Sequence, residues 1–330
     1  MKISVIMCTF CGEKYIKKQL DSIKNQTLSP TEVKIIDDCS SDNTVRIIKN
    51  YINEYSLNSW SIFVNIINKG WRINFYDAIK DCDGDIVFFC DQDDIWHLDK
   101  IEVMSRTLIK NPDILLLSSE KYLIDSNDKK ITKHWLLNYS ERYDFKVRKC
   151  LLYENLQLLR WKGYVGCSLA AKRELLQYLP FFQLNEYFAH DIWAIDLAAI
   201  LDGHYHINYP STDYRIHENN VSFKKSGIVC VKFAREEWLR NRSNYITSFL
   251  DGLKKIDVKK NLKEVKRLKR AKKFANKRLN LYKKANLLCW ISLIKYIDLY
   301  IYIRKIEYFV DLIDTLNLRK LFKKDKFLTQ

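Results

Sequence analysis

The first 90 residues alternate between β-branched apolar runs and segments with helical periodicity. Strands are expected at residues 2–10, 32–40, 60–67 and 84–90, and helices at residues 13–26, 40–55 and 68–82. Alternation of this length favours an α/β fold with a mostly parallel sheet. Because ligands of such sheets bind beyond the carboxyl ends of the strands, we expect the functional residues there.

The fourth strand ends in a cluster of carboxylates. Asp91, Asp93 and Asp94 directly follow the apolar run at residues 86–89. Residues two apart in an extended chain face the same side, so Asp91 and Asp93 could share one cleft. A divalent cation would remove their repulsion, and oxygen ligands suit Mg²⁺ or Mn²⁺. This stretch alone also allows a solvated acidic turn that starts a helix over residues 94–104, or an acid pair with a raised pKa and no metal.

Two other strand ends carry polar residues. Thr9 and Phe10 end the first strand, and Asp37 and Asp38 end the second. A carboxylate there can accept a hydrogen bond from a ligand, but Asp side chains also form turns by bonding their own backbone. Both interpretations of Asp37 and Asp38 stay open on residue type alone.

The nine cysteines do not form a regular framework. Cys8 and Cys11 have the C-x-x-C spacing of half a zinc site or a redox pair, but no second such pair occurs in the sequence. The odd count is typical of reduced thiols in a cytosolic protein. The apolar run in residues 1–10 is too short for a secretory signal, so a cytoplasmic location is expected.

The net charge of +16 is unevenly distributed along the chain. Residues 224–330 carry 29 Lys and Arg against 10 Asp and Glu, and residues 1–223 carry 27 against 30. The chain is therefore a near-neutral front joined to a strongly basic tail. Nucleic acid and anionic membranes are the usual partners of such a tail.

The region after the acidic cluster offers further candidate residues. Gly163 and Gly166 could let the backbone approach a ligand or could form an ordinary turn. Asp191 precedes an apolar helix, where it could be a helix cap or an ionised general base. Arg215 and His217 lie in a polar loop with Asn219, and could approach a diphosphate or a metal ion.

The basic tail contains one amphipathic helix and one aromatic segment. Apolar residues recur at helical spacing among lysines and arginines, at Val265, Leu268, Ala271, Ala275, Leu279 and Tyr282. Residues 287–303 are apolar and aromatic but contain Lys295 and Asp298, which makes a transmembrane helix a poor interpretation. A helix lying in the membrane interface fits better, and a helical bundle packed on the catalytic domain is the alternative.

Seven sequence blocks together carry a family resemblance. They include "IIDDCSSDNT", "NKGWRINF", "GDIVFFCDQDDIW", "HDIW" and "YRIHENNV", and they run in order from Ser4 to Val221. In these blocks the chain resembles a family 2 glycosyltransferase with the GT-A fold, a Rossmann-like sheet with flanking helices. The D-Q-D-D-I-W form is similar to that of bacterial rhamnosyltransferases and other enzymes that act on polysaccharide or O-antigen repeat units.

The resemblance implies a role for each matching position. The implied nucleoside and ribose contacts are Thr9, Phe10, Glu13, Asp38 and Asp91; the metal ligands are Asp93, Asp91 and His217; Arg215 contacts the diphosphate; and Asp191 is the general base. The chain departs from the family pattern at Cys11, where Asn is usual, so a contact by that side chain is not carried over.

The resemblance also implies an activity and a location. The expected reaction is inverting transfer of a sugar from a nucleotide-diphosphate donor, dTDP-rhamnose or a UDP-sugar, to a glycan acceptor that is lipid-linked, with Mn²⁺ or Mg²⁺. Residues 1–222 form the catalytic domain, divided into a nucleotide-sugar half (1–95) and an acceptor half (96–222). Residues 223–330 attach the enzyme to the inner face of the cell membrane or pack on the domain. No nucleic-acid partner is expected, and a homo-oligomer is left open.

Two rival classes make different demands on the sequence. A sugar nucleotidyltransferase should have a Gly-rich N-terminal loop with a basic residue for the triphosphate, whereas "TFCGEKY" contains a single glycine. A nucleic-acid-binding protein that used the basic tail would bind any duplex in a salt-sensitive way. It would leave the ordered blocks of the front region unexplained.

Overall fold

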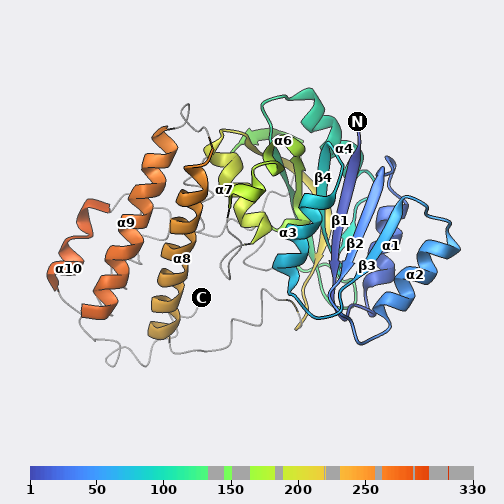
Figure 1. The fold of residues 1–330 in the computed structure, drawn as a ribbon, viewed down its shortest axis with the longest axis horizontal. Coiled ribbons are helices and arrows are strands. Elements are labelled where there is room, and N and C mark those ends of the chain that lie inside the picture. Colours follow the sequence, from blue (N-terminus) through green and yellow to red (C-terminus); the bar gives the residue numbers. More distant parts are fainter. Residues whose placement is uncertain are drawn as a thin grey trace. The chain divides into compact units, whose positions relative to one another are not determined.

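The computed structural model describes residues 1–132, 145–150, 164–182, 189–218, 220, 231–256, 262–284, 287–296 and 311. The chain divides into two compact units: residues 1–151 with 162–222, and residues 152–161 with 223–330. The first unit is an α/β structure, and the described part of the second is helical (Figure 1).

The first unit alternates strands and helices along the chain. The strands are β1 (Ile3–Thr9), β2 (Glu32–Asp37), β3 (Trp60–Val64), β4 (Ile86–Asp91), β5 (Ile95–Trp96), β6 (Leu116–Ile124), β7 (Val147–Lys149), β8 (Leu169–Lys172) and β9 (His204–Arg215). The helices are α1 (Ile16–Lys24), α2 (Thr44–Glu54), α3 (Trp71–Asp81), α4 (Lys100–Lys110), α6 (Arg173–Leu176) and α7 (His190–Ile200), with 3-10 turns η1 (Gly166–Ser168) and η2 (Leu179–Phe181). The predicted α/β class is confirmed, and all seven elements predicted before Asp91 are present.

One sheet joins all of these strands, in the order β3-β2-β1-β4-β8-β6-β9-β5, with β7 beside β9. Strands β1 to β4 are mutually parallel, whereas β8 runs antiparallel to both β4 and β6. The chain leaves β1 first toward β2 and β3, and later returns to its other side as β4. Beyond the carboxyl ends of β1 and β4 lies the point where ligands bind in open α/β sheets.

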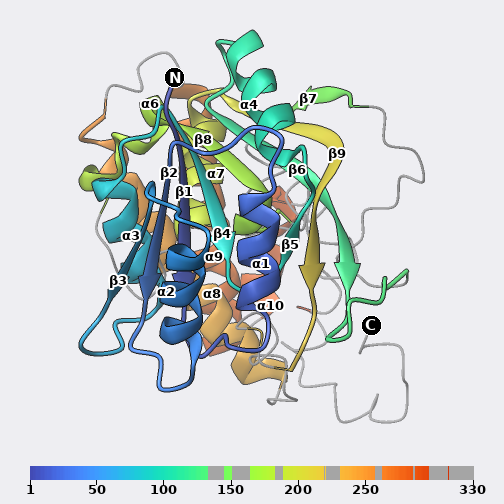
Figure 2. The same ribbon diagram turned by 90° about the vertical axis from the view of Figure 1, so that its right-hand side faces the viewer.

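Helices cover both faces of the sheet, as Figure 2 shows for α1 and α2 over one of them. The core on that face combines alternate residues of β1, such as Val5 and Met7, with apolar residues of α1, α2 and α4. Helices α3 and α7 pack together and lie against strands of the sheet. In α7 almost every residue is buried, which explains its continuous rather than amphipathic apolar sequence.

The predicted helix over residues 94–104 is wrong at its start. Ile95 and Trp96 pair antiparallel with Asp213 and Thr212 of β9, and α4 begins only at Lys100. This pairing buries Asp94 completely, so the acidic cluster is not a solvated helix cap. It also brings the end of β9 next to the end of β4.

The described part of the second unit contains α8 (Val231–Leu253), α9 (Leu262–Lys284), α10 (Leu287–Ile291) and the 3-10 turn η4 (Ile294–Tyr296). Figure 1 shows α9 between α8 and α10, and both pack against it. On α9 the predicted apolar face is confirmed at Leu268, Ala271 and Ala275, which are buried, whereas Val265 and Leu279 are half-buried. The side chain of Tyr282 and residues 297–303 lie outside the described residues.

A buried ion pair adds to the core of the second unit. The Arg278 guanidinium donates to both carboxylate oxygens of Asp311, at 2.7 and 2.9 Å. In the part of the chain that the structure describes, no helix has both the length and the apolar character needed to cross a bilayer.

Candidate active site

The carboxyl ends of β1, β2 and β4 lie side by side. In the parallel register Thr9 of β1 is opposite Asp37 of β2, and Cys8 is opposite Asp91 of β4. The polar residues that end three separate sequence segments therefore form one edge of the sheet.

Asp37 acts as a structural brace at the end of β2. Its buried carboxylate accepts hydrogen bonds from the Thr9 hydroxyl (2.7 Å), the Ser40 backbone N–H (2.8 Å) and the Ser40 hydroxyl (2.6 Å). The Thr9 side chain is buried and directed at Asp37. The predicted contact of Thr9 with the nucleoside stays a prediction. The Thr9 hydroxyl would have to make that contact in addition to its bond with Asp37.

Asp38 holds the loop that leads into α3. Its carboxylate accepts from the Asn65 side chain (3.0 Å) and from the backbone N–H groups of Lys69 and Gly70 (both 2.8 Å). Burial alone would raise the pKa of Asp38, but hydrogen bonds from Asn74, Asn65 and the backbone lower it below its ordinary value. Asp38 is therefore ionised and held in place by its donors, and its predicted contact with a base stays a prediction.

Phe10 and Glu13 form the more exposed part of this edge. The Phe10 ring is half exposed, while its backbone N–H and C=O are both bound by the Gln92 amide, at 2.8 and 3.0 Å. Glu13 accepts a hydrogen bond from the Asn43 backbone at 2.9 Å. Gln92 is a residue that the sequence analysis missed, although it lies inside the acidic block.

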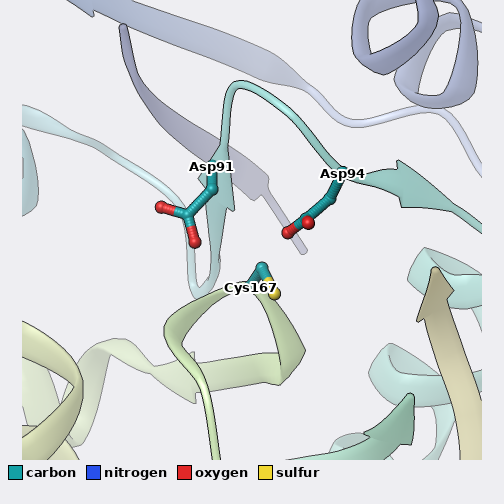
Figure 3. Close-up of side chains that lie close together, drawn as sticks. All are labelled: Asp91, Asp94 and Cys167. Atoms are coloured by element: carbon teal, nitrogen blue, oxygen red, sulfur yellow. The ribbon is translucent and has the colours of Figure 1, made fainter. Parts of the chain in front are cut away.

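The end of β4 brings Asp91, Asp94 and Cys167 together (Figure 3). One ligand atom from each lies within 4.8 Å of the others. Burial, followed by the charges of Asp94, Asp93 and Asp191, raises the pKa of Asp91 well above its ordinary value. Burial and the charge of Asp93 raise the pKa of Asp94 to about 7. The carboxylates at this strand end therefore repel one another.

Asp93 and His217 meet across the sheet, as a shared role in metal binding requires. The Asp93 carboxylate oxygen Oδ2 is 2.7 Å from Nε2 of His217, and both side chains are mostly buried. The His217 ring also packs on Tyr15, with ring centroids 5.1 Å apart. The antiparallel pairing of β5 with β9 makes this contact between residues 124 positions apart in the chain.

Arg215 is fully buried and braces the acidic loop. Its guanidinium donates to the Asp93 carbonyl at 2.7 Å and pairs with Asp128, and its backbone N–H donates to Asp94 at 2.9 Å. The third guanidinium nitrogen, Nη2, is buried and has no hydrogen-bond partner among the described residues. The predicted contact of Arg215 with a diphosphate stays a prediction.

Lys100 supplies counter-charge that the sequence analysis missed. Its buried ammonium group donates to the Thr212 hydroxyl at 2.8 Å and to the Cys167 carbonyl, and lies 3.9 Å from the Trp96 ring centroid. Burial lowers the pKa of Lys100 to about 8, although Asp94 and Asp91 oppose this effect. A lysine within a helical pattern is typical of a solvated face, so no local signal pointed to this position.

Asp191 lies in the first turn of α7, next to an unusual histidine. Its carboxylate accepts from the Ile192 N–H at 2.7 Å, and its charge reaches Asp91. His190 stacks on Phe75, with ring centroids 3.8 Å apart, and neither ring nitrogen has a hydrogen-bond partner among the described residues. Burial lowers the pKa of His190 to about 4, so the ring is neutral.

Gly166 explains how η1 passes this close to α7. A Cβ atom at Gly166 would lie 2.9 Å from Nε2 of His190 and 3.7 Å from Cβ of Asp191. Any larger residue would therefore press on the His190 ring, whereas its contact with Asp191 would be an ordinary one. Gly163 and Asn219, the other predicted members of these loops, lie outside the described residues.

The residues at this edge fit a divalent cation. Asp91 and Asp94 offer carboxylate oxygens that lie, with the Cys167 sulfur, within 4.8 Å of one another, and Asp93 and His217 contact each other; carboxylate and imidazole are ligands that Mn²⁺ accepts. Among the described residues no such compact group joins Asp91 to both Asp93 and His217. One oxygen of buried Asp94 has no hydrogen-bond partner in the described part of the chain, and the pKa of Asp91 is raised by its acidic neighbours. Added positive charge would relieve both conditions.

Comparison with known proteins decides the family. Residues 4–176, which are more than half of the chain, match the model of glycosyl transferase family 2. The chain belongs to this family. It is therefore a glycosyltransferase, as its sequence blocks predicted.

Two relatives extend the match beyond the family model. The dTDP-rhamnosyl transferase RfbG of Shigella flexneri is 31% identical over 255 residues, which cover 70% of this chain and 81% of that protein. An Escherichia coli enzyme, UDP-Glc:alpha-D-GlcNAc-diphosphoundecaprenol beta-1,3-glucosyltransferase WfgD, is 24% identical over 234 residues, or 70% and 76% of the two chains.

Solved structures confirm the GT-A fold. Staphylococcus aureus TarS 1–349 in complex with UDP-GlcNAc aligns with a TM-score of 0.58 and 17% identity, over 97% of this chain and 82% of that one. The mannosyltransferase PcManGT of Pyrobaculum calidifontis, in complex with GDP-Man and Mn²⁺, aligns with a TM-score of 0.50 and 17% identity, over 98% and 88%.

Proposed function

We propose that this glycosyltransferase moves a sugar from a nucleotide-diphosphate donor to a glycan acceptor with inversion, assisted by Mn²⁺ or Mg²⁺. The observation that carries the proposal is the contact of Asp93 with His217 at the strand end that carries Asp91. The charge of Asp191 reaches Asp91. These observations support a cation site and a base at one edge of the sheet. Asp93, His217 and Asp91 would hold the cation, whose positive charge stabilises the departing diphosphate.

Asp191 would act as the general base. Asp191 lies in the first turn of α7, and the neighbouring His190 ring is neutral. The acceptor hydroxyl gives its proton to the Asp191 carboxylate as its oxygen attacks the anomeric carbon. The bond from that carbon to the diphosphate oxygen breaks in the same step, and one in-line displacement inverts the carbon.

The exposed residues Phe10 and Glu13, with buried Asp38 behind them, would bind the nucleoside. The Phe10 ring could stack on the base, and the ionised Asp38 carboxylate could accept from a base N–H. The Gln92 amide bonds both the N–H and the C=O of Phe10, and so fixes the backbone that carries the Phe10 ring. Cys11, exposed in a left-handed backbone conformation, stands where the family usually has Asn.

We favour dTDP-rhamnose as donor, with UDP-sugars as the second candidate. The Shigella relative, a dTDP-rhamnosyl transferase that shares 31% identity over most of both chains, supports the first donor. The name of the E. coli relative supports the second and also suggests a diphosphoundecaprenol-linked acceptor in O-antigen or other surface polysaccharide synthesis. Such an acceptor would keep the enzyme at the cytoplasmic face of the membrane.

Thermal shift with a panel of donors tests this proposal. The full chain is heated with dTDP-rhamnose, UDP-glucose or GDP-mannose, with and without Mn²⁺. A ligand that binds only the folded state raises the melting temperature by mass action. We expect the largest shift with dTDP-rhamnose and Mn²⁺ together, and release of dTDP once a suitable acceptor is added. No shift with any donor, with or without metal, would contradict the proposal.

A further inference from the structure

The α10–η4 segment of the second unit is apolar on two sides. One side packs on α9 through Leu293 and Tyr296, which are buried, and Tyr296 lies 5.7 Å from the Phe274 ring. The other side carries Leu287, Leu288, Ile291 and Ile294, each 44–72% exposed. These four residues are called the α10 face below.

The α10 face spans only eight residues of the chain. Leu287, Leu288 and Ile291 lie on the short helix α10, and Ile294 begins η4 three residues later. Single exposed apolar side chains are normal on soluble proteins, but a clustered apolar surface marks a binding site for a protein or a membrane.

Basic groups border the α10 face. Arg270 donates to the Lys295 carbonyl at 3.0 Å, and Lys277 donates to the Ser292 hydroxyl at 3.1 Å, so both lie beside this segment. Lys295 itself is exposed directly after Ile294. Residues 262–296 contain 12 Lys and Arg against a single acidic residue, Glu264.

We propose that the α10 face inserts into the outer part of an anionic bilayer leaflet, with Arg270, Lys277 and Lys295 at the level of the lipid phosphates. Charge selects this partner over a second copy of the chain, because two copies would bring like charges together. The inference rests on the proposed function, which places the acceptor in a membrane. It identifies the residues that would attach the enzyme there.

Salt separates the two parts of this attachment. Attraction between the basic groups and lipid phosphates is screened within about 3 Å at 1 M salt, whereas burial of the α10 face is not screened. Wild-type enzyme should therefore keep a salt-resistant bound fraction that depends on the apolar side chains alone.

Vesicle sedimentation of the full chain tests the proposal. The variant L288S/I291S removes two members of the α10 face, and L262S removes a leucine that is 57% exposed at the start of α9 and lies outside that face. The vesicles contain phosphatidylcholine with or without phosphatidylglycerol. Because all three side chains are exposed, the variants should fold like the wild type, which circular dichroism checks.

We expect wild-type protein and L262S to pellet with anionic vesicles and to remain partly bound at about 1 M salt. For L288S/I291S the salt-resistant partition should fall by at least about tenfold, because the variant lacks two apolar side chains that would be buried in the bilayer. Equal partition of L288S/I291S and wild type at high salt would overturn the proposal. So would wild-type protein that ignores vesicles and instead self-associates through the α10 face, as judged by sedimentation velocity.

Donor binding without vesicles separates this proposal from the function itself. Thermal shift with dTDP and Mn²⁺ reports the nucleotide site and should be the same in wild type, L262S and L288S/I291S. Nucleotide binding without vesicle binding would refute the membrane attachment through the α10 face and leave the proposed function standing. Vesicle binding that depends on the α10 face, without any nucleotide binding, would support the attachment and refute the proposed function.

Discussion

Two strand ends of the sheet carry neighbouring carboxylates. Hydrogen-bond donors stabilise the negative charge at one of them but not at the other. At the end of β2, hydrogen-bond donors surround Asp37 and Asp38, and the pKa of Asp38 is lowered. At the end of β4, Asp94 is buried and Asp91 half-buried, each with few donors, and the pKa of each is raised. The sequences "IIDDCS" and "FFCDQDD" do not reveal this difference.

The difference indicates which strand end has its charges fully compensated by the protein itself. At the β2 end, protein donors bind the carboxylates, and these bonds stabilise the fold. The β4 end holds more negative charge than Lys100 offsets, which is typical of a site that binds a cationic group or performs acid-base chemistry. Substitutions at the two ends should therefore affect different properties.

The largest effect is expected for Asp93→Asn at the β4 end. An amide adds no negative charge and weakens cation binding, so loss of metal assistance should lower transfer by more than about 10³-fold. Calorimetric titration with nucleoside diphosphate and Mn²⁺ should show no metal-dependent binding. The surface variant Asp113→Asn is the matched control. Wild-type affinity in Asp93→Asn would remove Asp93 from the site.

Asp191→Asn should separate chemistry from binding. Loss of a general base lowers turnover by roughly 10²–10⁴-fold, while donor affinity should stay close to that of the wild type because Asp191 is not proposed to contact the donor. Steady-state kinetics with a competent acceptor and donor titration measure the two properties. Full turnover would leave Asp191 as a residue of the helix N-terminus only.

At the β2 end, Asp37→Ala should lower stability rather than cation dependence. It leaves the Thr9 and Ser40 donors without their buried acceptor, so the free energy of unfolding should fall by about 1–3 kcal/mol. Urea denaturation measures this change. Thr9→Ser, which keeps the hydroxyl donor, should be much milder. An Asp37→Ala protein of normal stability that no longer responds to Mn²⁺ would break the proposed contrast.

The smallest effect is expected for the pH dependence of stability at His190. The buried ring has a pKa of about 4, below the value near 6.5 of the unfolded chain. Between these values the unfolded state binds more protons, so stability should fall as the pH decreases from about 6.5 to 4.

His190→Phe should reduce this acid sensitivity, because Phe fits the stack on Phe75 and cannot bind a proton. Melting temperatures at pH 7 and pH 5 compare the two proteins. The same decrease in both would show that other groups cause the acid sensitivity.

Much of the nucleotide half could be predicted from local pattern. Each element before Asp91 is short, and its apolar residues follow the pattern of either a strand or a helix. The strands and helices were therefore predicted in the correct order. The acidic block at the end of β4 was recognised for the same reason. The error over residues 94–104 arose because Ile95 and Trp96 also fit a helical pattern, and only their pairing with β9 makes them a strand.

The sequence by itself determined the α/β class, the family and the positions of the candidate carboxylates, because these depend on periodicity and on ordered local blocks. Only the tertiary structure decided which carboxylates are satisfied and which groups surround them. Lys100 joins the site from a helix whose local sequence suggests a solvated face, Gln92 and Cys167 take up contacts that their neighbours in the sequence do not reveal, and Arg215 is fully buried. Burial and long-range pairing set the charge balance of a site, and neither can be read from neighbours in the chain.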